Sequence, residues 1–135
     1  MGTAFSFLQA AAYVSAILLV GIAGFQVMLL LGLPLGAYSW GGKHPGVLPK
    51  RLRLLSLPAA CVLLLIGFIF LVHTDAVAID MPSAFTRILV WIFTIFLGLN
   101  TLGNLASKSR QEKRAMAPLS GILFVCGLYI ALYGG

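Results

Sequence analysis

The sequence predicts an all-α polytopic membrane protein, with four transmembrane helices in a bundle of two hairpins. Of the 135 residues, 61% are apolar and only 9% are charged, whereas soluble domains carry about 25% charged residues. The mean hydropathy is +1.06. Four long uncharged stretches alternate with short polar segments, and each stretch is long enough to cross a hydrocarbon core of roughly 30 Å. We therefore expect residues 1–135 to form a single membrane domain with little mass outside the bilayer.

The predicted spans follow the limits of the uncharged stretches. The first, residues 7–35, exceeds the roughly 20 residues that a bilayer requires, so this helix is expected to tilt, kink or extend past the interface. The others are predicted at residues 54–74, 84–107 and 115–133. No cation precedes Lys43, so the first stretch lacks the positive region of a signal peptide and is interpreted as a true span.

Capping and proline signals suggest where the helices begin and end. Pro34 is expected to mark the end of the first helix or a kink near it. Ser56, followed closely by Pro58, resembles an N-cap with proline in the first turn of the second helix. Ser109 and Glu112 have the spacing of a capping box, so a helical turn is expected to begin there.

The distribution of charge predicts how the chain is oriented. The segment between the first two spans carries four cations and no acid, and the segment between the last two carries four cations and one acid. The segment between the second and third spans, counted to Arg87 at the start of the third span, contains Asp75, Asp80 and that single cation. Cations concentrate in cytoplasmic segments of membrane proteins. We therefore predict that both basic segments lie in the cytoplasm and that both termini lie on the opposite side of the membrane.

The two basic segments are the strongest candidate for a binding surface. Each Lys or Arg near a membrane surface contributes about 1 kcal/mol of attraction to anionic lipid, so anionic headgroups are the expected partner. Orientation of the chain is the alternative role, and that rule also explains the net charge of +6 without nucleic acid. If the segments meet, their guanidinium groups could also hold a phosphate or carboxylate. The candidate residues are Trp40, Lys43, His44, Lys50, Arg51, Arg53, Lys108, Arg110, Lys113 and Arg114.

Three amide side chains interrupt the apolar spans. Asn100 and Asn104 are four residues apart, which places them on one helix face, and Gln26 is the one strongly polar group in the middle of the first span. Together they could line a polar path. The alternative is that they join helices by hydrogen bonds, each worth about 0.6–2 kcal/mol.

Other chemistry has little support in the sequence. Cys61 and Cys126 lie in apolar runs without a CxxC motif, so they are interpreted as buried free thiols. His44 has no neighbouring Cys, Asp or Glu to complete a metal site. The spans hold no acid or base at mid-membrane, where ion-coupled transporters place one. We therefore predict no catalytic residue, cofactor or metal ligand.

Two stretches, residues 32–56 and 91–118, resemble those of a group of small, uncharacterised four-helix inner-membrane proteins of bacteria. The first contains the pattern Gly-Gly-x-His-x-Gly-x-Leu-Pro-x-x-Leu-Arg at residues 41–53, and the second contains the pattern Asn-Leu-Ala-Ser-x-Ser-x-x-Glu at residues 104–112. The resemblance covers about half of the chain and implies a bacterial cell-membrane location. It implies no activity.

Three functions remain open at this stage. The first is a non-enzymatic oligomeric channel or transporter for a small solute, with Gln26, Asn100 and Asn104 lining its pore. The second is an accessory or scaffold subunit that packs through its glycine-rich first helix against a larger membrane partner. The third is a lipid-active enzyme using His44, which no nucleophile–base arrangement supports. The small size and many glycines favour a homo-oligomer or a membrane partner protein.

Overall fold

The computed structural model describes residues 6–134 and is an all-helical bundle. In this part of the chain the α-helices are α1 (Phe7–Leu30), α2 (Lys50–His73), α3 (Ser83–Leu105) and α4 (Arg110–Tyr133). Each has 23 or 24 residues, which corresponds to about 35 Å of helix and is enough to cross a bilayer. All four are apolar enough to do so. The chain is therefore a multi-pass integral membrane protein.

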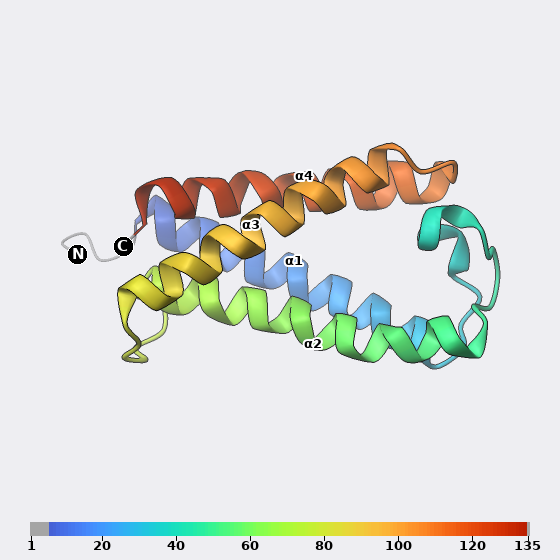
Figure 1. Ribbon diagram of the computed structural model, residues 1–135, viewed down its shortest axis with the longest axis horizontal. Coiled ribbons are helices and arrows are strands. Elements are labelled where there is room, and N and C mark those ends of the chain that lie inside the picture. The colour runs from blue at the N-terminus through green and yellow to red at the C-terminus, as the bar shows by residue number, and fades with distance from the viewer. Residues whose placement is uncertain (1–5, 135) are drawn as a thin grey trace.

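The bundle consists of two hairpins, as the sequence predicts. Helices α1 and α2 pack along each other, and so do α3 and α4, whereas α2 and α3 contact each other much less. In Figure 1 the two hairpins meet at the end that holds the 75–82 connection and diverge toward the opposite end. At that opposite end, residues 36–48 lie between the hairpins. They include two short 3₁₀ helices, η1 (Gly36–Tyr38) and η2 (Trp40–Gly42).

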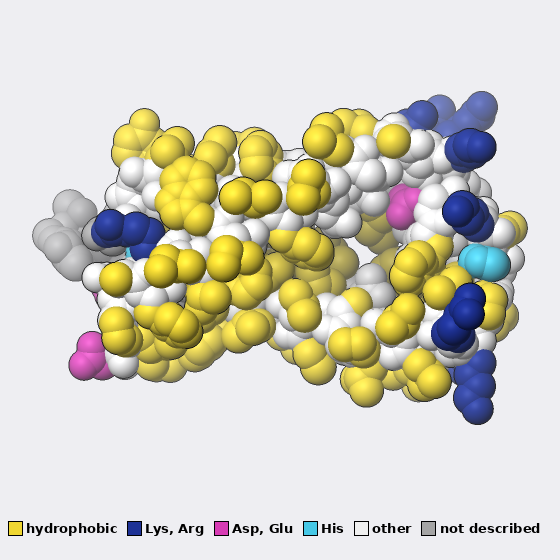
Figure 2. Space-filling view, in the orientation of Figure 1, with side chains coloured by type: hydrophobic (Ala, Val, Ile, Leu, Met, Phe, Trp, Pro, Cys, Tyr) yellow, Lys and Arg dark blue, Asp and Glu magenta, His cyan; other side chains and the backbone are white. Residues whose placement is uncertain are grey.

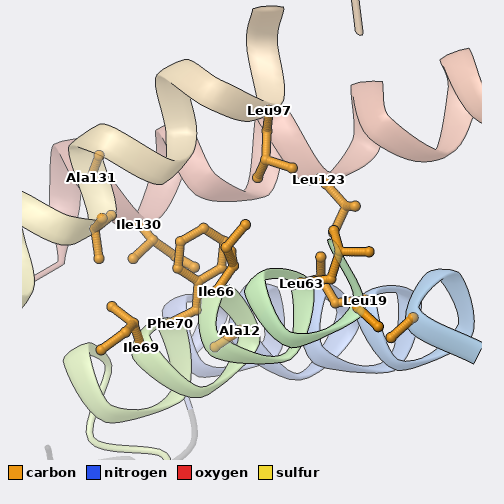
Figure 3. Close-up of a cluster of buried hydrophobic side chains, with 13 residues drawn as sticks. Ala12, Leu19, Leu63, Ile66, Ile69, Phe70, Leu97, Leu123, Ile130 and Ala131 are labelled. Atoms are coloured by element: carbon orange, nitrogen blue, oxygen red, sulfur yellow. The ribbon is translucent and has the colours of Figure 1, made fainter. Parts of the chain in front are cut away.

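A cluster of buried apolar side chains joins the hairpins near the 75–82 connection (Figure 3). Phe70 and Ile66 from α2 point toward Ile130 of α4, and all three side chains are fully buried. Gly127 makes this approach possible, since a Cβ there would crowd the Phe70 ring and the hydroxyl of Thr94. The core therefore fills the bundle with hydrocarbon in this half of the molecule.

The first helix ends at Leu30, five residues before the predicted limit of its span. Gly32 adopts a φ of +93° and stops the helix in a Schellman-type ending, in which the Leu33 amide donates to the Met28 carbonyl at 3.1 Å. Pro34 lies beyond this ending, so the prediction that it marks the end or a kink of the helix was wrong. The positive φ of glycine, rather than proline, decides where α1 stops.

Two helices begin earlier than their uncharged spans. Helix α2 starts at Lys50 after the N-cap residue Pro49, so Ser56 lies inside the helix and is not its N-cap. Helix α4 starts at Arg110, with Ser109 as its N-cap. Both helices thus carry a turn of basic residues before the apolar span. An uncharged stretch measures the depth of the hydrocarbon core, whereas a helix can continue through the interface into water.

Candidate functional site

Eight of the nine Lys and Arg residues lie at the end of the bundle where the hairpins diverge (Figure 2). We call this set the cationic end. The acid of this end, Glu112, is only 8% exposed, so it leaves the surface cations uncompensated. Seven of the cations are exposed to solvent: Lys43, Lys50, Arg51, Lys108, Arg110, Lys113 and Arg114.

Arg53 is the half-buried member of the cationic end, and its guanidinium faces the end of α1. Its Nε and Nη2 atoms donate to the Leu30 carbonyl oxygen at 3.3 and 3.1 Å. Carbonyl groups in the last turn of a helix lack partners within the helix, and a cation there is favourable. Two of the Arg53 donors are therefore occupied by a structural contact.

Residues 36–48 are folded tightly on themselves by glycine. The Gly36 amide donates to the Gly46 carbonyl at 2.7 Å, and a Cβ on Gly36 would overlap the His44 carbonyl oxygen. Gly42 has a positive φ and lies so close to Ser109 that a side chain there would clash. This segment is therefore an ordered cap rather than an open loop.

The cap is fastened to the beginning of α4. The Gly41 amide donates to Glu112 Oε1 at 3.0 Å, and the Ser109 hydroxyl donates to the Ala37 carbonyl. Ser109 also caps α4, because its hydroxyl accepts from the Glu112 amide at 3.3 Å. The expected helix start at Ser109 is confirmed, but Glu112 does not complete the capping box. Its carboxylate instead binds a backbone amide 71 residues away.

The two sequence patterns are thus the two sides of one contact. The first, at residues 41–53, supplies Gly41 and Gly42, and the second, at residues 104–112, supplies Ser109 and Glu112. Ala37 belongs to the same contact, and the sequence gives no signal for it. The Ser109–Glu112 spacing predicts the start of a helix. It does not predict that the Glu112 carboxylate accepts from an amide of the glycine-rich segment.

Trp40 and His44 lie in the cap without forming a recognisable reactive site. Trp40 is 45% exposed, consistent with an aromatic side chain at the membrane interface. His44 is partly buried, and its backbone carbonyl lies against Gly36. Among residues 6–134 there is no cluster of three His, Cys, Asp or Glu side chains that could hold a metal ion.

Gln26 and Asn100 lie in the same groove, which Figure 2 shows as a hollow between α2 and α3. The groove has a volume of about 360 Å³ and opens to the side of the bundle. Both amides reach it from different hairpins, on α1 and α3. No side chain or backbone group of residues 6–134 hydrogen-bonds either amide. The rest of the lining is apolar: Ile22, Pro58, Ala59, Val62, Leu63 and Phe96.

Asn104 does not line this groove. It is buried at the contact between α3 and α4, where its amide nitrogen donates to the Ser120 hydroxyl at 3.0 Å. That hydroxyl in turn donates to the Met116 carbonyl at 2.8 Å. Asn104 therefore joins two helices, while Asn100, one turn away, presents an unpaired amide to the groove.

The glycines of the first helix leave open space beside them. Gly21 and Gly24 are exposed, and a Cβ on either would meet nothing within 4 Å. Gly21 borders a lateral pocket that α1 shares with Met116 and Leu119 of α4.

Comparison of the chain with protein-family models, with curated proteins and with solved structures gives no match.

Proposed function

We propose that this chain is a non-enzymatic accessory protein of the bacterial inner membrane whose cationic end binds anionic lipid headgroups at the cytoplasmic surface. Both termini then lie in the periplasm. The observation that supports this proposal is the charge of an ordered surface. Seven exposed cations lie at one end, and the acid of that end is buried against the Gly41 amide. Such a surface attracts anionic groups at about 1 kcal/mol per cation.

The apolar core favours this role over conduction through a single chain. Phe70, Ile66 and Ile130 are fully buried where the two hairpins meet, so hydrocarbon occupies the place where a central pore would lie. At the opposite end, the cap lies between the two hairpins (Figure 1). Binding of lipid headgroups at the cationic end requires neither the apolar core nor the cap to move.

The proposal is tested by the selectivity of the full chain for lipid in a reconstituted bilayer. Spin-labelled phosphatidylglycerol and spin-labelled phosphatidylcholine are compared in phosphatidylcholine vesicles containing the protein. We expect the anionic label to be enriched among the lipids immobilised by the protein, and the enrichment to fall at high salt, because salt screens exposed charges. Equal immobilisation of both labels at low salt would rule out headgroup binding.

An oligomeric channel is the second candidate, because Gln26 and Asn100 both lie in a groove that faces outward. Several copies could turn such grooves toward a shared path. The test is the flux of a small solute into vesicles that contain the protein. A channel predicts flux that Asn100→Leu abolishes, whereas absence of flux in the unmodified protein counts against it.

A further inference from the structure

We propose that the lateral groove between α2 and α3 is a binding site for one anionic diacyl glycerophospholipid of the surrounding membrane. This inference rests on the proposed function, because it assigns one headgroup bound by the cationic end to a defined site. The acyl chains would lie along the apolar lining, the ester carbonyls beside Gln26 and Asn100, and the phosphate beside Arg51.

The unpaired amides are the first argument. Gln26 and Asn100 each carry two N–H donors, and no group in residues 6–134 accepts from them. An amide without a partner in an apolar medium costs roughly 2–7 kcal/mol. Ester carbonyls of a glycerolipid are acceptors, so a lipid in the groove would satisfy donors that the protein leaves open.

The depth of the two amides is the second argument. Gln26 lies four residues before the end of α1 at Leu30, and Asn100 lies five residues before the end of α3 at Leu105. At 1.5 Å per residue, both are about 6–8 Å inside the helix ends at the cationic end. Helices of this length extend about 2–3 Å beyond each side of a hydrocarbon core of roughly 30 Å, so both amides would lie a few ångströms inside the hydrocarbon, close to the ester groups of a phospholipid.

Charge complementarity is the third argument. Arg51, Pro58 and Val62 are spaced by seven and four residues on α2, so they share one face of the helix. Pro58 and Val62 line the groove, and Arg51 is exposed about 10 Å further toward the cationic end. An anionic headgroup above the groove would therefore meet a guanidinium group, which binds phosphate well.

The remaining lining suits acyl chains. Apart from the two amides, the groove is formed by aliphatic side chains, one proline and the Phe96 ring. It opens sideways between two transmembrane helices, so a lipid could enter from the membrane without crossing the polar surface.

The test uses the full chain purified in detergent, with phosphatidylglycerol as the probe and native mass spectrometry as the readout. We expect one phosphatidylglycerol to be retained per chain, with a preference over phosphatidylcholine of about tenfold, which corresponds to about 1.4 kcal/mol. Arg51→Gln, Asn100→Leu and the groove-filling Ala59→Phe are each expected to weaken retention about fivefold or more.

Two matched controls separate the groove from general attraction. Lys113→Gln removes an exposed cation on the other hairpin, and Leu57→Phe enlarges an exposed side chain on α2 that lies outside the groove. Lys113→Gln should weaken retention less than Arg51→Gln does, and Leu57→Phe should keep it within about twofold of the unmodified chain. If Lys113→Gln and Arg51→Gln weaken binding equally while Asn100→Leu has no effect, the headgroup-binding proposal stands and the groove site is wrong. If the unmodified chain shows no preference for phosphatidylglycerol, both are wrong.

Cross-linking tests whether a second copy fills the groove instead. Val62→Cys is introduced with Cys61→Ala and Cys126→Ala, and the protein is oxidised in phosphatidylglycerol-containing bilayers. The lipid site predicts that the chain stays monomeric after oxidation. An efficient disulfide between two Val62→Cys chains would show that another protein chain covers the groove and would overturn the proposal.

Discussion

At the scale of single residues, two asparagines on one helix face have different roles. Asn104 donates to Ser120 across the contact between α3 and α4, whereas Asn100 has no partner within residues 6–134. Spacing alone places both on the same face of α3. Their roles differ because α4 covers only one of them, and that arrangement depends on contacts between helices rather than on local sequence.

This difference predicts opposite effects of the same substitution. Asn104→Leu should lower the free energy of unfolding by about 0.6–2 kcal/mol, since it removes a hydrogen bond between helices. Asn100→Leu should leave stability unchanged or raise it, because it replaces an unpaired amide with an apolar side chain. Unfolding of the protein in mixed micelles with increasing dodecyl sulfate measures both. A larger loss for Asn100→Leu than for Asn104→Leu would contradict the assignment.

A second residue-scale prediction concerns the glycine that closes the cap. A methyl group on Gly36 would overlap the His44 carbonyl oxygen, and crowding of a packed site costs about 1–3 kcal/mol. Gly36→Ala should therefore lower the thermal unfolding midpoint in detergent.

Gly103→Ala is the matched control, because a Cβ there meets nothing within 4 Å. Replacing glycine by alanine inside a helix is favourable by about 0.5–1 kcal/mol, so this variant should be as stable as the unmodified chain or more stable. Equal losses for the two variants would show that the cap is not tightly packed.

At the scale of elements, the beginning of α4 is organised by a contact distant in sequence. Glu112 accepts from the Gly41 amide, so it holds the cap as well as lying in the first turn of a helix, where an acid is favourable. Glu112→Ala should therefore increase hydrogen exchange at the Gly41 amide and lower stability by about 1.5–3 kcal/mol.

A conservative variant tests whether a side-chain acceptor at position 112 is sufficient to hold the cap. Glu112→Gln keeps a side-chain oxygen that can accept from the Gly41 amide, so exchange at that amide should remain slower than in Glu112→Ala. Exchange that is unchanged in Glu112→Ala would mean that the contact does not hold the cap.

The elements also show which boundaries can be predicted from sequence. The four spans were recognisable because charged and apolar residues are sharply separated. The end of α1 was not recognisable in the sequence. It depends on the positive φ of Gly32 and on Arg53, which approaches from the next helix. The start of α2 was placed too late, since basic residues can extend a helix through the interface without entering the hydrocarbon.

At the scale of the whole molecule, too, some features can be predicted from the sequence and others cannot. Membrane class and the hairpin arrangement follow from composition and the order of apolar stretches, because each helix must bury its own backbone polar groups. The groove does not follow from them. It exists because the two hairpins diverge from the buried cluster around Phe70, so that Gln26 and Asn100 reach one hollow from different hairpins.

Lipid binding at the cytoplasmic surface requires the cationic end to face the cytoplasm, and labelling of single cysteines tests this orientation most directly. In a chain carrying Cys61→Ala and Cys126→Ala, Asp80→Cys and Lys108→Cys are introduced separately and intact bacterial cells are exposed to a membrane-impermeant maleimide. We predict that Asp80→Cys is labelled from outside, and that Lys108→Cys is labelled only after the inner membrane is opened. Labelling of Lys108→Cys in intact cells, with Asp80→Cys protected, would contradict the account.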